Sequence, residues 1–172
     1  QFVLSGSGRL AEEPAVRTRH IEFIGNSLTC GYGTDGKHRD EPFLVETENC
    51  NLTFASMVAR YYDADYTLIA HSGRGAARNY GDSVRVSKVT MKDRMLNTFD
   101  EDLTHKWNFK EYRPDLVVIN LGSNDFSTEP HPYKSEFTKA YKQILAQLRE
   151  HYGDIPILCI YPVAMQAPVF SY

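Results

Sequence analysis

Apolar runs alternate with helical patterns along this chain. Four short apolar runs are typical of buried strands, at residues 21–24, 66–70, 116–121 and 155–161. Apolar residues at spacings of three and four predict helices between and after these runs, at residues 52–62, 89–99 and 135–152. Strands that alternate with helices favour a parallel sheet with right-handed crossovers. The sequence therefore predicts an α/β fold, a three-layer α/β/α sandwich.

Residues 1–19 show no such period. They are rich in glycine, serine, glutamate and arginine around Pro14, which predicts a linker or the tail of an upstream element. The chain begins with Gln1 rather than methionine, so we expect it to come from a longer precursor. The domain is expected to occupy residues 20–172. Within it, residues 33–50 form a long polar loop, and such loops in compact domains are usually functional or mobile.

Each of the first three predicted strands ends in a polar loop that contains glycine. A parallel sheet gathers such loops at its carboxyl edge, so Ser27, Gly73 and Asn124 are expected to meet there. A serine hydroxyl beside a backbone N–H and a side-chain amide has the parts that acyl transfer needs, namely a nucleophile and donors for the oxyanion. The alternative is that Asn26 or Ser27 only caps a helix, as such residues often do.

The three loops, Gly25-Asn26-Ser27-Leu28, Gly73 and Gly122-Ser123-Asn124-Asp125, resemble the first three blocks of the SGNH (GDSL-type) hydrolases. The stretches IEFIGNSLTCGYG, SGRGAARNYGD and YRPDLVVINLGSNDFS resemble more narrowly the second family of carbohydrate esterases, which remove acetyl groups from plant polysaccharides. The resemblance extends from about residue 19 to residue 163.

This resemblance implies an SGNH/flavodoxin-like parallel sheet and a serine ester hydrolase. Ser27 would be the nucleophile, and the N–H groups of Ser27 and Gly73 and the Asn124 side chain would form the oxyanion hole. The substrate would be an acetylated carbohydrate or another small ester. The resemblance also suggests a secreted or periplasmic protein, and a small β-sandwich before the catalytic domain, of which residues 1–19 would be the last trace.

The sequence departs from the family pattern at two points. Asn26 stands where the superfamily usually has aspartate, and no Asp-x-x-His block, which supplies the catalytic base in the family, follows Asn124 before Tyr172. We therefore expect a partial domain that lacks the C-terminal part of the fold and turns over slowly. An apolar sheet face beside the first strand would be covered by another chain or by a continuation. The alternative function is a catalytically inactive SGNH-fold pseudoenzyme that acts as a binding or structural module.

Composition and the absence of nucleotide-binding and zinc-binding motifs limit the classes of function that this sequence can have. The 172 residues include 42% hydrophobic residues and carry a net charge of −3, which fits one globular domain at most. This balance gives no electrostatic argument for nucleic acid or a membrane surface, and no apolar run has the length of a membrane-spanning helix. No Gly-x-Gly-x-x-Gly or P-loop supports a nucleotide binder, and no Cys-x-x-Cys or histidine cluster supports zinc. Neither a cofactor nor a metal is expected.

The three cysteines and the polar residues 74–82 can each be interpreted in two ways. Cys30 and Cys50 bracket the long loop and either form a disulfide or stay reduced, and with that disulfide Cys159 would be a buried free thiol. Residues 74–82, with two arginines beside the expected site, either grip a polar substrate such as a sugar or form a solvated turn; the turn is favoured.

Two Asp-x-x-His sequences occur before the third block. Asp35 and His38 lie in the long loop, and Asp102 and His105 follow the second predicted helix. The family does not supply its base from either place, so both pairs are interpreted as coincidences of spacing.

Overall fold

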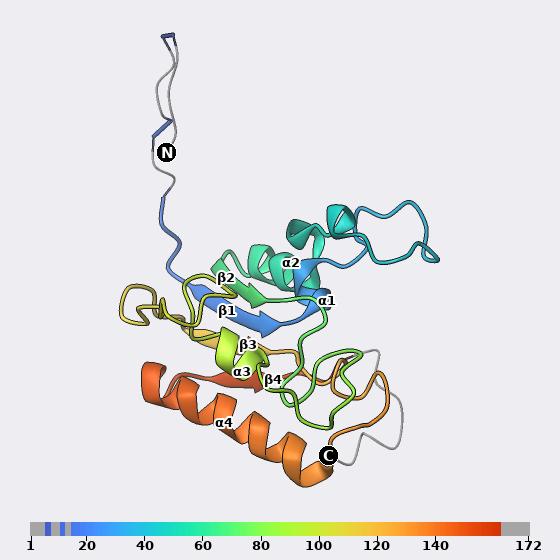
Figure 1. Cartoon of the computed structure of the whole chain (residues 1–172). Coiled ribbons are helices and arrows are strands. Elements are labelled where there is room, and N and C mark those ends of the chain that lie inside the picture. Colours follow the sequence, from blue (N-terminus) through green and yellow to red (C-terminus); the bar gives the residue numbers. More distant parts are fainter. Residues whose placement is uncertain (1–5, 8–10, 13–14, 163–172) are drawn as a thin grey trace.

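The computed structural model describes residues 6–7, 11–12 and 15–162. Residues 1–5, 8–10 and 13–14 of the linker predicted over residues 1–19, and residues 163–172, lie outside the described residues. Figure 1 shows a single sheet between helices. The strands are β1 (His20–Gly25), β2 (Asp65–Ala70), β3 (Leu116–Ile119) and β4 (Ile157–Cys159). The helices are α1 (Ser27–Cys30), α2 (Phe54–Tyr61), α3 (Met91–Arg94) and α4 (Lys134–Tyr152), with the short 3₁₀ turns η1 (Val45–Thr47) and η2 (Cys50–Leu52).

The sheet is parallel throughout and has the strand order β2-β1-β3-β4. Gly25, the last residue of β1, is paired with Ala70, the last residue of β2, and Ile24 is paired with Ile119 at the end of β3. The carboxyl ends of these three strands are therefore level with one another. This register confirms the predicted parallel α/β fold and brings the three loops to one edge.

Two apolar clusters lie on opposite faces of the sheet, as the alternation of side chains along a strand requires. Ile21 and Phe23 of β1 pack with Ala55 and Ala59 of α2. Ile24 of β1 belongs to the other cluster, with residues of α3 and α4 such as Met91, Ile144 and Leu148. Figure 1 shows α2 on one side of the sheet and α3 and α4 on the other, which is the predicted three-layer arrangement.

Two predicted helices differ from those observed. The helix expected at residues 52–62 begins at Phe54, because the Thr53 side chain caps it by accepting from the Ser56 N–H, while Leu52 lies in η2. The helix expected at residues 89–99 is one turn long. It starts with a capping box between Thr90 and Asp93 and is followed by turns. Met91 and Met95 are buried as predicted, but Phe99 is 62% exposed, because the chain after α3 forms turns and does not continue one helical stripe.

The apolar side chains exposed at the sheet lie on and beside β4, not beside β1. Every residue of β1 is buried, whereas Leu158 of β4 is 50% exposed and Tyr161 is 43% exposed. The expectation that the face beside the first strand lacks cover is therefore wrong, because β1 is central and α2 and α4 cover its two faces. The edge strand β4 carries the exposed apolar surface instead.

The three cysteines are free thiols, and Cys159 is exposed rather than buried. Within the part of the chain that the structure describes, no helix combines the length and apolar character that crossing a membrane requires.

Candidate active site

Ser27 lies at the turn between β1 and α1, as its first helical residue. Helix α1 packs tightly over the end of the strand, because a Cβ added at Gly25 would lie 2.0 Å from the Thr29 hydroxyl oxygen. Asn26 caps the helix: its Oδ1 accepts from the Leu28 N–H at 3.2 Å. The structure thus confirms the capping interpretation for Asn26, and the cap fixes Ser27 at the helix start, where backbone N–H groups are free of helical partners.

Asn26 also connects the first loop to the third. Its Nδ2 donates to the Ser123 hydroxyl at 2.9 Å, and its side chain is fully buried. An asparagine can make both bonds because its amide both accepts and donates. The residue that departs from the family pattern therefore holds two of the three loops together.

The second and third loops are joined more extensively. The buried carboxylate of Asp125 accepts from three consecutive backbone N–H groups, those of Ala76 at 3.0 Å, Ala77 at 2.6 Å and Arg78 at 2.9 Å. Burial raises the pKa of Asp125, and these three donors oppose the rise. The neighbouring Asn124 donates through Nδ2 to the Arg74 carbonyl at 2.8 Å. These bonds fix the Asn124 amide beside the Gly73 loop.

Gly73 has a φ of +80°, a conformation that side chains with a Cβ rarely adopt. An added Cβ would find only the Tyr80 Cβ, at 4.0 Å, so the requirement for glycine comes from the backbone conformation and not from lack of space. Its φ turns the chain sharply at the end of β2.

Ser27, Gly73 and Asn124 line one cavity with a volume of about 850 Å³. The structure therefore brings together the three residues that the sequence predicts. No hydrogen bond to the Ser27 hydroxyl occurs within residues 15–162. One nitrogen-bound hydrogen of Asn124 is used by Arg74, which leaves the second for a ligand.

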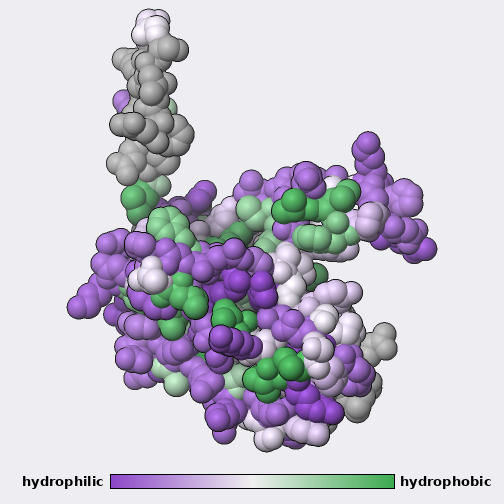
Figure 2. Space-filling model, viewed as in Figure 1, coloured by the Kyte–Doolittle hydropathy of each residue, from purple (hydrophilic) through white to green (hydrophobic). Residues whose placement is uncertain are grey.

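Aromatic side chains stand on two sides of this cavity. Tyr32 and Phe43 stack with ring centroids 5.4 Å apart, and Tyr80 follows the Gly73 loop. All three are exposed. In Figure 2 the loop of residues 33–50 projects from the body as an arm that carries apolar side chains, with a hollow beneath it. The long loop thus supplies part of the cavity wall.

Cys30 lies in the same cavity, close to Ser72 and Glu48. Burial is the main cause that raises the pKa of the Cys30 thiol. Because the thiolate is the nucleophilic form, this shift makes the thiol a poorer nucleophile near neutral pH than an unperturbed cysteine. Glu48 accepts a hydrogen bond from the Ser72 hydroxyl. Ser27 is therefore the better candidate for a nucleophile.

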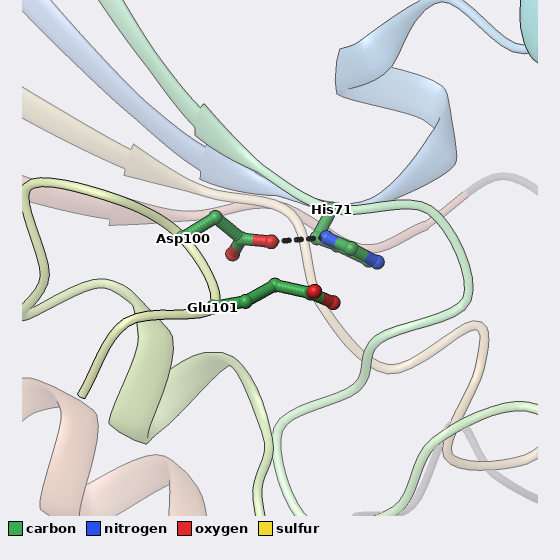
Figure 3. Close-up of side chains that lie close together, drawn as sticks. All are labelled: His71, Asp100 and Glu101. Atoms are coloured by element: carbon green, nitrogen blue, oxygen red, sulfur yellow. Dashed lines mark hydrogen bonds and ion pairs between the residues drawn. The ribbon is translucent and has the colours of Figure 1, made fainter.

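His71 is a cavity residue that the sequence analysis did not select. Its Nδ1 lies 2.5 Å from Asp100 Oδ2, and Arg94 Nη1 donates to the same oxygen at 2.5 Å. Figure 3 shows His71, Asp100 and Glu101 side by side. His71 follows directly after β2, which was a usable signal, but Asp100 lies 29 residues further along the chain and no motif connects the two.

The same three side chains have ligand atoms within 4.8 Å of one another, close enough to hold a metal ion. However, Arg94 also donates to Glu101 at 3.4 Å, and its side chain is only 8% exposed. A divalent cation would have to displace a mostly buried guanidinium from both carboxylates. The donor set therefore fits a hydrogen-bonded pair that is neutralised by arginine better than it fits a metal site.

The other sequence candidates lie elsewhere. His38 lines a separate hollow in the long loop, and His105 pairs with Asp102 at 2.5 Å on the surface. Arg78 is fully buried and donates to the carbonyls of Val84 and Glu129, so it neither lines the Ser27 cavity nor belongs to a solvated turn.

Comparisons with known proteins agree with this geometry. Residues 23–172 match the model of the GDSL-like Lipase/Acylhydrolase family. The chain is 39% identical over 154 residues to the cellulase/esterase CelE of Acetivibrio thermocellus, covering 90% of this chain and 18% of that protein. It is 42% identical over 115 residues to an acetylxylan esterase / glucomannan deacetylase of Cellvibrio japonicus, covering 65% and 31%.

A solved structure is also similar. A family two carbohydrate esterase from Clostridium thermocellum, determined in complex with cellohexaose, matches with a TM-score of 0.86 and 37% identity over 95% of this chain and 49% of that one. The chain thus spans less than half the length of each of these relatives.

Proposed function

Because the chain belongs to the GDSL-like lipase/acylhydrolase family, we propose that it is part of a serine ester hydrolase that removes acetyl groups from a carbohydrate. The observation that carries the proposal is that Ser27, Gly73 and Asn124 come from three different loops and line one cavity. Such a set can bind an ester carbonyl and attack it from one side.

In the proposed reaction the Ser27 oxygen attacks the acetyl carbon and loses its proton to a base. Collapse of the tetrahedral intermediate breaks the bond to the sugar oxygen, which takes up that proton and leaves as a hydroxyl. A water molecule then attacks the acetyl-serine, and acetate and free Ser27 are released. No Asp-x-x-His block follows Asn124 in the printed sequence, so the proposal assigns no residue as the base.

The oxyanion would be held by the N–H groups of Ser27 and Gly73 and by the second amide hydrogen of Asn124. The hydrogen bonds of Asn124 and Asp125 to the 74–78 loop support this role, because they fix the donors before the substrate arrives. Fixed donors stabilise the transition state without having to reorganise, and one such donor is worth roughly 10²–10³ in turnover.

Two observations support a carbohydrate as the acetylated molecule. The exposed rings of Tyr32, Phe43 and Tyr80 beside the cavity offer flat apolar faces, which suit the C–H faces of a sugar ring. The similar proteins are named as a cellulase/esterase and an acetylxylan esterase / glucomannan deacetylase.

A fluorophosphonate probe tests the nucleophile without requiring the natural substrate. We expect the probe to label Ser27, the Ser27→Ala variant to remain unlabelled, and the exposed-surface variant Ser135→Ala to label normally. Acetate release from acetylated xylo-oligosaccharides and from acetylated glucomannan then identifies the substrate. Absence of both labelling and acetate release would support the alternative, an inactive SGNH-fold pseudoenzyme that acts as a binding or structural module, which the esterase names of the relatives do not favour.

A further inference from the structure

The cluster of His71, Asp100 and Arg94 lies on the wall of the Ser27 cavity and takes no part in the reaction described above. Arg94 is mostly buried and donates to Asp100, whose oxygen also contacts the His71 ring at Nδ1. The His71 ring is thereby held by Arg94 and Asp100, which follow it in the sequence by more than twenty positions. A fixed imidazole at the edge of a substrate cavity can discriminate between ligands.

The partners of His71 determine its tautomer. A neutral imidazole has one nitrogen that donates and one that accepts. Arginine donates only, and a carboxylate accepts only, so Asp100 accepts from both Arg94 and His71 Nδ1. Arg94 Nη1 also lies 3.5 Å from His71 Nδ1, the limit of a hydrogen bond, so the 2.5 Å contact with Asp100 decides the tautomer. In the neutral ring, Nδ1 therefore carries the proton and Nε2 keeps its lone pair. Within residues 15–162 Nε2 has no hydrogen-bond partner, and Figure 3 shows it on the side of the ring away from Asp100.

We propose that His71 binds the substrate through Nε2, which accepts a hydrogen bond from a hydroxyl of the sugar that carries the acetyl group. Asp100 and Arg94 are positioning residues that hold the ring and its tautomer. The proposal rests on the proposed function. Sugars are rich in hydroxyl donors, and Glu48, the carboxylate that lines the cavity, already accepts from Ser72.

Two other roles fit the geometry less well. A metal would have to displace Arg94 from both Asp100 and Glu101. A general base must lie within hydrogen-bond reach of the proton it takes, and no hydrogen bond joins His71 to Ser27. Contact with the ligand is the role that needs neither a displaced arginine nor a moved ring.

Two substitutions of His71 distinguish the role of Nδ1 from that of Nε2. In His71→Asn the side-chain amide can still donate to Asp100 as Nδ1 does, but no atom remains at the position of Nε2. In His71→Gln the amide oxygen can reach the Nε2 position and accept. The matched control is His38→Asn, which changes a histidine outside the Ser27 cavity.

Calorimetric titration with an acetylated xylo-oligosaccharide measures the dissociation constant of each variant. We expect the dissociation constant to rise about tenfold in His71→Asn, which corresponds to the loss of one hydrogen bond. It should return towards the original value in His71→Gln and stay unchanged in His38→Asn. Nitrogen-15 NMR of the histidine rings gives an independent readout. It should show the proton on Nδ1 of His71 in the unaltered chain and a shift of the proton to Nε2 in Asp100→Ala.

Hydrolysis of 4-nitrophenyl acetate by the unaltered chain and by Ser27→Ala tests the proposed function separately, because this ester carries no sugar hydroxyl. If only that hydrolysis fails, the result contradicts the proposed esterase function. The saccharide dissociation constants of the unaltered chain and the His71 variants then still decide the role of His71. Equal saccharide affinity of His71→Asn and the unaltered chain overturns the role of His71, as does absence of saccharide binding by the unaltered chain. A larger loss of 4-nitrophenyl acetate turnover than of saccharide affinity in His71→Asn also overturns it, because His71 would then act on Ser27.

Discussion

Two asparagines of the site use the same functional group for different purposes. The Asn26 amide is fully buried: its oxygen accepts from the Leu28 N–H and its nitrogen donates to the Ser123 hydroxyl. The Asn124 amide lines the cavity and keeps one hydrogen free after bonding to Arg74. At the residue scale, the difference in free hydrogen-bonding capacity distinguishes a structural amide from a candidate catalytic one.

Replacing Asn124 by alanine removes one proposed oxyanion donor. We expect turnover to fall by roughly 10²–10³-fold with little change in the Michaelis constant, because the donor acts on the charge of the transition state. Steady-state kinetics on an acetylated saccharide measure both constants, and Asn108→Ala, outside the cavity, is the control. An unchanged turnover would remove Asn124 from the mechanism. Thermal unfolding shows whether loss of the Arg74 bond alone has disturbed the loop.

Replacing Asn26 by aspartate gives the residue that the wider family usually has. One carboxylate oxygen can still accept from the Leu28 N–H, and the Ser123 hydroxyl can rotate to donate to the other. We expect the free energy of unfolding to change by no more than about 1 kcal/mol and the activity to change modestly. Urea unfolding and the same kinetic assay measure the two quantities. A large gain in activity would identify Asn26 as an inactivating difference.

At the scale of elements, the loops after β2 and β3 act as one unit. Three backbone N–H groups of the 76–78 segment converge on the buried carboxylate of Asp125. Gly75 allows the close approach, because a Cβ there would lie 2.4 Å from Asp125 Oδ2. The two loops that carry Gly73 and Asn124 are therefore fixed to each other rather than to the sheet alone.

Replacing Asp125 by asparagine tests this coupling. The amide nitrogen cannot accept, so one of the three N–H groups loses its partner, and leaving a buried donor unsatisfied costs about 1–3 kcal/mol. Asp125→Ala should cost more, because all three donors lose their partner. Urea unfolding measures the change, with Asp154→Asn, an exposed position after the end of α4, as the control. Equal stability of all three variants would show that the loops are held by other contacts.

At the scale of the whole molecule, one buried acid connects the sheet to the longest helix. Glu22 of β1 is 2% exposed and accepts from the Tyr152 hydroxyl of α4 at 2.8 Å, while its second oxygen has no partner. Burial raises the pKa of Glu22 from 4.5 to about 7, against the lowering effect of the Tyr152 hydrogen bond. The folded protein therefore holds a proton that the unfolded chain releases.

This difference predicts how stability depends on pH. Between pH 4.5 and about 7 the folded state binds the additional proton, so the free energy of unfolding falls as the pH rises through this range and levels off above it. The full loss is of the order of 3 kcal/mol, since each pH unit between the two pKa values is worth about 1.4 kcal/mol.

Glu22→Gln keeps an acceptor for Tyr152 without a charge. We expect it to be more stable than the unaltered chain at pH 8 and similar to it at pH 4.5, whereas the exposed control Glu150→Gln should follow the unaltered chain at both values. Urea unfolding at the two pH values measures this. Parallel pH profiles for Glu22→Gln and the unaltered chain would contradict the prediction.

The sequence by itself determined the parallel α/β fold, the four strands and the identity of the three loops. Apolar runs and polar turns are local patterns, and the parallel direction of β1, β2 and β3 follows from them once the strands alternate with helices. The meeting of Ser27, Gly73 and Asn124 could be predicted for the same reason, because each of them directly follows a strand or its first turn.

Only the tertiary structure decided the contacts between residues that are distant in sequence. Asp100 reaches His71 over 29 positions, Asp125 reaches the 76–78 loop over nearly 50, and Tyr152 reaches Glu22 over 130. Each of these partners sits in a segment whose local pattern is that of an ordinary turn, strand or helix end. A buried carboxylate takes whichever donors the packing of the chain brings to it, so its partner follows from the fold and cannot be read from the neighbouring residues.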